Sequence, residues 1–313
     1  MQETERKGRT DNIRNLLHTL QGVPALYRLS DDHLFLLISY LLNSDILGME
    51  LLTSHDLWKR ASGYGGIAVS EAQDRLFVAN YCNDQIAAYS IPDGQLLASW
   101  GGRGDPIGCF RFSRESGLGV LGNELFVADT WNLRVQVFAF NGRFLRSWKL
   151  MNNAIPRALA TSEKEILITT EAERPYFGDG SMQVFSPLGN FVSRWSSRGN
   201  KAGQCISPVG IYVDTLANKI FVADPSNNRI QIFSHDTHAF LHEFPVYQPQ
   251  GVVARNDKMY VSTKSSIVVL STSTGKCIWS WKCPMEDEIR ALALSDQYLF
   301  VRAVTGKGVY ILT

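Results

Sequence analysis

Alternating apolar and polar residues dominate the chain from residue 61 to its end. The clearest copies of one repeated unit are LFVADTWNLRVQVF at 125–138 and IFVADPSNNRIQIF at 220–233. Each unit reads as an apolar strand, a turn rich in Asn or Pro, and a second strand of period two, which predicts a β-hairpin. Weaker copies lie at 76–89, 166–185, 259–270 and 299–312, so the sequence predicts six hairpins.

Two further strands accompany most of these hairpins. A short apolar strand opened by glycine comes before four of them, at Gly66, Gly117, Gly210 and Gly251. A strand that ends in tryptophan comes after four of them, at 94–100, 142–148, 189–195 and 275–281. A four-stranded unit cannot bury both faces alone, so such units pack radially on one another. The sequence thus predicts a mainly all-β fold, a six-bladed β-propeller over residues 61–313.

The pattern F-V-A-D-x-x-N-x-R-I-Q-V-F resembles the NHL repeat of six-bladed propellers, and the resemblance extends over residues 61–313. Asp and Arg stand five residues apart in the two best copies, as Asp129 with Arg134 and Asp224 with Arg229. Such residues flank the hairpin turn and suit structural cross-strand ion pairs. The first copy has Asn80 with Gln85 instead, which we expect to form an uncharged hydrogen-bonded pair that locks the turn.

The last predicted blade has only three strands before the chain ends at Thr313. Residues 51–60 contain Leu57-Trp58 near their end and are long enough to supply the missing outer strand. A strand supplied from the other end of the propeller would close the ring and protect its edges.

Residues 9–50 lack strand periodicity and predict short helices. We divide the region into a polar leader with a short helix, 1–22, and a helical segment, 23–60. The string LSDDHLFLLISYLLNSDIL at 29–47 resembles an F-box, although Ser30 replaces the usual proline. The resemblance implies an apolar surface that docks the Skp-type adaptor of a cullin-type ubiquitin ligase, formed by Leu29, Leu34, Ile38, Leu41 and Ile46. The alternative is that these side chains pack among themselves and against the propeller.

Charge and cysteine content narrow the possible partners and the cellular compartment of the protein. Thirty-one Lys and Arg against thirty Asp and Glu give a net charge of +1, so no global field attracts nucleic acid or an anionic membrane. We see no secretory signal and no transmembrane segment. Five cysteines without C-x-x-C spacing favour free thiols in a reducing compartment, so we expect a cytoplasmic or nuclear protein.

No catalytic motif stands out in the sequence. The six histidines show no converging metal-ligand set, and the glycine-rich run at 101–105 is interpreted as a flexible connection between blades. We therefore expect a protein that is not an enzyme, with no cofactor, no metal and no small-molecule substrate.

Arginine opens the inner strand of the third and sixth predicted blades, at Arg157 and Arg290. Opposite blades face each other across the axis, so both guanidinium groups would flank the channel entrance and could hold a carboxylate or phosphate of a partner. The alternative is local pairing, such as Arg157 with Glu171. Trp131 and Tyr81, in corresponding turns of adjacent blades, are candidates for a contact surface or for packing between blades.

Three functions follow as hypotheses. The first is an F-box-like substrate receptor, in which the helices dock an adaptor and the propeller captures an unidentified client protein. The second is binding of single-stranded RNA, which requires a basic face with aromatic stacking. The third is a propeller lyase or lactonase, which requires ligands that converge in the channel.

Overall fold

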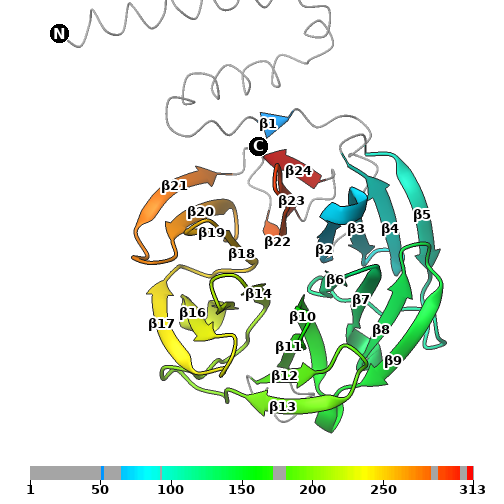
Figure 1. Cartoon of the computed structure of the whole chain (residues 1–313), viewed down its shortest axis with the longest axis horizontal. Helices are drawn as coiled ribbons and strands as arrows, with labels where there is room; N and C mark the ends of the chain where they lie inside the picture. Colours follow the sequence, from blue (N-terminus) through cyan, green and yellow to red (C-terminus); the bar gives the residue numbers. More distant parts are fainter. Residues whose placement is uncertain are drawn as a thin grey trace, which may run out of the picture. The chain divides into compact units, whose positions relative to one another are not determined.

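The computed structural model describes residues 51–52, 65–91, 94–171, 181–282, 288–303 and 309–312. By its contacts the chain divides into two units, Met1–Glu50 and Leu51–Thr313. The first unit lies outside the described residues, and with it lie the predicted helices and the five side chains of the predicted adaptor surface. The second unit is a β-propeller (Figure 1).

Five blades are antiparallel sheets of four consecutive strands that run outward from the centre of the ring (Figure 1). Their strands are β2 (Ile67–Ser70), β3 (Arg75–Asn80), β4 (Gln85–Ser90) and β5 (Leu96–Gly101); β6 (Leu118–Leu121), β7 (Glu124–Asp129), β8 (Arg134–Ala139) and β9 (Phe144–Lys149); β10 (Ile155–Thr161), β11 (Ile166–Glu171), β12 (Met182–Phe185) and β13 (Phe191–Trp195); β14 (Gly210–Asp214), β15 (Lys219–Asp224), β16 (Arg229–Ser234) and β17 (Phe240–Pro245); and β18 (Val252–Arg255), β19 (Lys258–Ser262), β20 (Ser266–Ser271) and β21 (Cys277–Lys282). We number these blades one to five in chain order.

The remaining sheet is composite and has the order β1-β24-β23-β22. Its strands are β1 (Leu51–Leu52), β22 (Ile289–Leu294), β23 (Leu299–Ala303) and β24 (Val309–Leu312). The prediction of six like blades is therefore corrected: five blades are complete units of consecutive strands, and the last sheet takes its outer strand from the other end of the propeller. The reason is that β22, β23 and β24 form only three strands of this sheet, and β1 pairs with the outer edge of β24. Residues 51–60 were expected to fill the place, and β1 occupies the first two of them, with 53–60 outside the described part.

Apolar clusters between neighbouring sheets hold the ring together. One cluster joins Phe77 of blade one to Leu125 of blade two, another joins Phe126 of blade two to Ile168 of blade three, and the pattern continues around the ring. The middle strands are buried on both faces, because each blade is covered by the next. This is why apolar residues fill the predicted hairpins almost without interruption.

The tryptophans that end the outer strands pack on the next blade. Trp100 covers Gly142, and Trp148 covers Gly189, each at the turn that leads into the next outer strand. Both glycines have a positive φ, +86° and +91°, and a Cβ there would lie within 3 Å of the indole ring. Glycine is therefore required by the backbone conformation and by the neighbouring ring together.

Candidate binding face at the channel mouth

The Asp–Arg spacing that the two best repeats share produces a buried hydrogen-bond network at two hairpin turns. In blade two, Asp129 is fully buried, and its Oδ2 accepts hydrogen bonds from Arg134 Nε at 2.7 Å and Gln136 Nε2 at 3.0 Å. Asn132 Nδ2 donates to both oxygens of Asp129, and the backbone N–H of Arg111 donates to Oδ1 at 2.8 Å. We call the four side chains Asp129, Asn132, Arg134 and Gln136 the turn network of blade two.

Blade four repeats this turn network with Asp224, Asn227, Arg229 and Gln231. Asp224 is fully buried and accepts from Arg229 Nε at 3.2 Å and from Asn227 Nδ2 at 2.6 Å. The cross-strand ion pairs expected from the sequence therefore form in both blades. Each carboxylate is surrounded by four donors, so its lone pairs are used within the fold and the network is structural.

The glycine-rich loop before blade two is held by this network, so the interpretation of 101–105 as a flexible connection is wrong. The loop closes on itself through a bridge between Arg103 and Phe110. Asn132 Nδ2 then donates to the Gly104 carbonyl at 2.9 Å, and Arg134 Nη2 donates to the Cys109 carbonyl at 3.0 Å. The loop before blade four is held in the same way, through Asn227, Arg229 and a bridge between Arg198 and Cys205.

Blade one departs from this arrangement. Asn80 and Gln85 lie opposite each other in the strand register, as expected. Their described hydrogen bonds, however, go to neighbours in the turn: Asn80 Oδ1 accepts from the Cys82 N–H, and Gln85 Oε1 accepts from Asn83 Nδ2. Asp84 in this turn is buried and accepts from the Phe112 N–H at 2.7 Å. Asp84 was missed by the sequence analysis, because it stands outside the repeated Asp–Arg spacing.

The inner strands β2, β6, β10, β14, β18 and β22 surround the axis of the propeller (Figure 1). Neighbouring inner strands are hydrogen-bonded near their starts, since the Gly66 N–H donates to the Ser116 carbonyl and the Gly117 N–H donates to the Arg157 carbonyl. The hairpin turns lie at this same end of the blades, because the Ala128 N–H, just before the turn of blade two, donates to Gly117 O. We call this end the mouth face.

Arg157 and Arg290 meet at the mouth face through one carboxylate, that of Glu115. Arg157 Nη1 donates to Glu115 Oε2, and Arg290 Nη1 donates to Glu115 Oε1 at 3.0 Å. Each arginine uses Nη2 for a second carboxylate, Glu171 for Arg157 and Glu288 for Arg290. We call these five residues the mouth clamp. Arg157 thus pairs locally with Glu171, which was the alternative to holding a carboxylate or phosphate of a partner, and the sequence did not single out Glu115.

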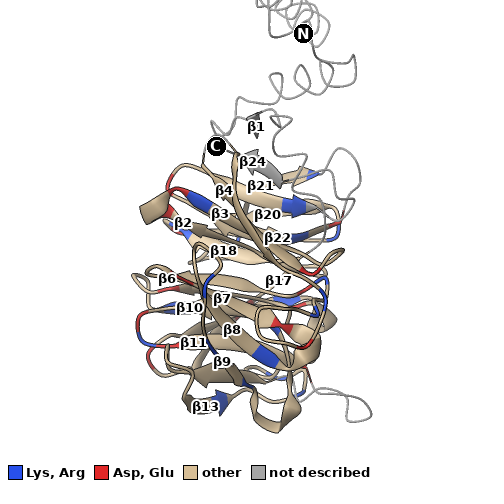
Figure 2. Cartoon of the chain, turned by 90° about the vertical axis from the view of Figure 1, so that its right-hand side faces the viewer, with Lys and Arg blue, Asp and Glu red and all other residues tan. Residues whose placement is uncertain are grey.

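The mouth clamp contains charges of both signs. Burial would lower the pKa of Arg157, and the negative charges and hydrogen bonds of Glu115 and Glu171 outweigh it, so the net shift is upward. Two guanidinium groups face three carboxylates, and Arg114 also lines the space below. Figure 2 shows Lys and Arg mixed with Asp and Glu on the visible side of the propeller, without a continuous area of one sign.

Two aromatic side chains of the mouth face are open to solvent. Trp131 keeps 58% of its surface exposed and Tyr81 keeps 38%. Trp131 belongs to the three-residue helix η5 (Thr130–Asn132), whose backbone is fixed when the Trp131 N–H donates to the Arg111 carbonyl. Neither ring is buried between blades, and their exposure favours the contact surface, one of the two interpretations of the sequence.

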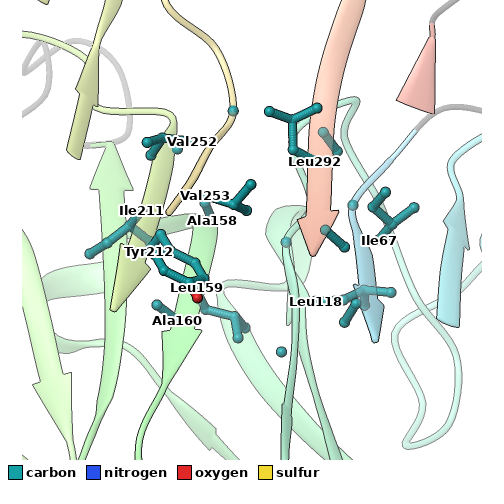
Figure 3. Close-up of a pocket in the computed structure, with 18 of the residues that line it drawn as sticks. Ile67, Leu118, Ala158, Leu159, Ala160, Ile211, Tyr212, Val252, Val253 and Leu292 are labelled. Carbon is teal, nitrogen blue, oxygen red and sulfur yellow. The ribbon is translucent and has the colours of Figure 1, made fainter. Parts of the chain in front are cut away.

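A cavity of about 230 Å³ occupies the channel below the mouth clamp (Figure 3). Glu115 and Arg290 line its charged end. The rest of its wall comes from the inner strands and is mainly apolar, with Ile67, Leu118, Leu159, Ile211, Val252 and Leu292 among its residues and Tyr212 beside Leu159 (Figure 3).

His238 and Cys205 are engaged within the fold. His238 Nε2 lies 2.9 Å from Glu165 Oε1, and its ring stacks on Trp195. Burial and the negative charge of Asp224 raise the pKa of Cys205 to about 12, so this thiol is a poor nucleophile. Within the described ranges, no group of three or more His, Cys, Asp or Glu side chains is placed to hold a metal ion. The helices in those ranges span three residues each, and none could cross a membrane.

No protein-family model matches the chain, and no curated protein matches it at a significant level.

Proposed function

We propose that this chain is a non-catalytic binding protein in which the mouth face of the propeller captures a partner protein. The observation that carries the proposal is the combination of exposed Trp131 and Tyr81 with the mouth clamp at one end of a closed ring. Aromatic and arginine side chains are enriched where proteins bind one another. The buried carboxylates Asp129 and Asp224 are fully engaged within the fold and leave no free acid or base there.

We further propose that the propeller is of the NHL type, with the composite sheet closing its ring. The support is the repeated Asp–Asn–Arg–Gln arrangement of blades two and four, together with the matching loop that each one holds. Four strands in every sheet, the composite one included, agree with this architecture.

The two other functions suggested by the sequence receive less support from the mouth face. RNA binding requires a basic face, whereas three carboxylates surround the two arginines of the mouth clamp. A lyase or lactonase requires polar ligands that converge in the channel, whereas the cavity wall there is mainly apolar. Binding of a protein fits an apolar channel with a charged rim.

The specific role we propose is that of an F-box-like substrate receptor of a cullin-type ubiquitin ligase, in the cytoplasm or nucleus. Its support is the sequence at 29–47, in which Leu29, Leu34, Ile38, Leu41 and Ile46 match the apolar positions of the family. In this role the N-terminal segment binds a Skp-type adaptor, the propeller selects the client, and catalysis resides in the partners.

Co-purification of the full chain with a Skp-type adaptor tests this role. We expect stoichiometric binding by the wild type and loss of binding by the double variant Leu34→Asp/Ile38→Asp, because charges on the docking surface oppose its burial. Leu216→Asp, at a fully exposed propeller residue, is the matched control and should bind like the wild type. If the adaptor does not bind the wild-type chain, the ubiquitin-ligase proposal is wrong.

A separate measurement tests the mouth face. Cross-linking followed by mass spectrometry should place client contacts near Trp131, and the variant Trp131→Ala should weaken them by about tenfold or more, as expected for an aromatic residue central to an interface. Contacts that map only to the opposite face, near Leu216 in the turn between β14 and β15, would contradict capture at the mouth face.

A further inference from the structure

We propose that the channel mouth binds the free C-terminus of a partner protein, and that Glu115 of this chain occupies the place of that terminal carboxylate. The inference rests on the proposed function in one respect, namely that the ligand is a protein. It is otherwise carried by three features: the way the arginines hold Glu115, the place of Glu115 in the chain, and the apolar cavity below.

The two arginines hold Glu115 as a pair of donors would hold any carboxylate. Each contributes Nη1 to a different oxygen of the same group, Arg157 to Oε2 and Arg290 to Oε1. Each also donates Nη2 to a carboxylate near its own strand, Glu171 or Glu288, which fixes the orientation of the guanidinium plane. Without Glu115, two oriented donors would still converge on the axis. A second carboxylate can therefore replace Glu115 without rearranging the anchors.

Glu115 is well placed to move aside. It belongs to the loop that connects β5 to β6, not to a strand, and its side chain is 24% exposed. The short turn around it is closed by the Ser116 N–H on the Ser113 carbonyl, and this bond does not involve the Glu115 carboxylate. A rotation of the side chain toward solvent thus breaks only its two bonds to the arginines.

The cavity below the mouth clamp indicates an apolar body behind the carboxylate. Arg290 and Glu115 line the same cavity as the leucine, isoleucine and valine residues of the inner strands. Its volume of about 230 Å³ far exceeds the roughly 10–15 Å³ that one water needs. It lies below the range of about 300–1,000 Å³ typical of drug-sized ligand sites. A cavity of this size suits the side chain of one or two amino acids.

A C-terminal residue satisfies both parts of the site at once. It carries its carboxylate and its side chain on the same Cα, so the carboxylate can lie between Arg157 and Arg290 while the side chain enters the channel. An internal Asp or Glu has its carboxylate at the tip of the side chain, and the apolar channel would stay empty. A phosphate would bring close to two negative charges beside Glu171 and Glu288, which already lie there. The site therefore favours a singly charged carboxylate with an apolar side chain.

Fluorescence anisotropy with the full-length protein tests the inference. The probe is a fluorescein-labelled peptide of alternating Gly and Ser that ends in Leu, made once with a free C-terminus and once as the amide. We expect the variant Glu115→Ala to bind the free acid at least about tenfold more tightly than the wild type, because an intramolecular competitor has been removed. The amide should show no such gain, and the double variant Glu115→Ala/Arg290→Gln should lose it.

Glu163→Ala is the matched control, because it removes an equally charged, exposed side chain from the turn between β10 and β11, away from the mouth face. It should bind both peptides as the wild type does. Equal binding of acid and amide by Glu115→Ala would overturn the inference. Equal competition by acetate, N-acetyl-leucine and inorganic phosphate would also overturn it, since it would indicate a general anion site.

This experiment is independent of adaptor binding. Discrimination between acid and amide together with a failed adaptor co-purification would end the ubiquitin-ligase proposal and leave the C-terminus site intact. The reverse result would end the C-terminus site alone. Thermal unfolding of each variant shows whether a change in affinity follows from a change in folding.

Discussion

The turn networks and the mouth clamp are built from the same kinds of side chain and serve different ends. In the turn networks, Asp129 and Asp224 are fully buried and each has donors from its own blade and from the adjoining loop. In the mouth clamp, Glu115 is partly exposed and its described hydrogen bonds through the carboxylate go to two arginines of distant sheets. An Arg–carboxylate pair alone therefore does not tell the role of the contact. We infer that a carboxylate that is buried among many donors is structural, and that one that is partly exposed with few donors is replaceable.

Removal of the buried carboxylate should give the largest effect. Asp224→Ala removes the fully buried carboxylate partner of Arg229, whose side chain is 8% exposed and which keeps only Glu243, 42% exposed, and it leaves the Ile206 N–H without its acceptor. We expect a loss of about 3–5 kcal/mol in the free energy of unfolding. Urea unfolding monitored by circular dichroism measures it. A loss below 1 kcal/mol would show that the turn network does not stabilise the blade.

Removal of the amide from the turn network should cost less. Gln136 is fully buried, accepts from the Gly108 N–H at 3.0 Å and donates to the Cys109 carbonyl at 2.8 Å. In Gln136→Met the shape is similar, but the Gly108 N–H loses its acceptor and the Cys109 carbonyl keeps only its bond from Arg134, so we expect about 2 kcal/mol of destabilisation. Hydrogen exchange at Gly108 should rise in parallel. Unchanged exchange there would mean that the loop is held without this amide.

The buried thiol of blade four should make stability depend on alkaline pH. The pKa of Cys205 is raised from 9.0 to about 12, so above pH 9 the unfolded thiol ionises while the folded one stays protonated. The unfolded state is then favoured as pH rises. We expect Cys205 to account for a loss of about 1 kcal/mol between pH 8 and 10.

Urea unfolding at the two pH values measures this loss, and Cys205→Ala should abolish it. The variant Cys277→Ala, at an exposed cysteine, is the control and should keep the wild-type difference. An equal difference in all three proteins would assign the pH dependence to other groups.

The mouth clamp should give the smallest effect on stability. In Glu115→Gln we expect a change of less than about 1 kcal/mol, because the side chain is partly exposed and both arginines keep a second carboxylate. The same urea titration measures it. A loss as large as that of Asp224→Ala would make the clamp structural and erase the contrast between the two networks.

The sequence predicted the hairpins and their registers well. Period-two alternation fixes which side chains share a face, and the turn fixes which residues pair, so Asp129 lies opposite Arg134 and Leu125 opposite Phe138. The weaker copies of the repeat also form four-stranded sheets, because they keep the apolar residues that pack between sheets although their polar turn residues differ. The predicted arginines at the mouth followed from the same reasoning, since opposite strands of a closed ring share one entrance.

The loops and the mouth clamp were harder to predict. The loop at 102–110 was misinterpreted because its glycines suggest freedom, whereas the side chains that fix it come from the following hairpin. A signal was present, since Arg103-Gly104 with Gly108 has the same spacing as Arg198-Gly199 with Gly203. Glu115 could not be found in this way, because its partners depend on how sheets distant in sequence close around the axis. The F-box-like segment stays a prediction from sequence.

The composite sheet sets an order of events for synthesis of the protein. Leu51 pairs with Leu312, so β1 can pair with β24 only after β24 has been synthesised. Everything encoded before residue 51 leaves the ribosome while the ring is still open, and contacts between such distant segments form late in folding. A chain interrupted anywhere before its last strand would therefore present an unsealed ring, whose unpaired edge is the natural target of chaperones and proteases.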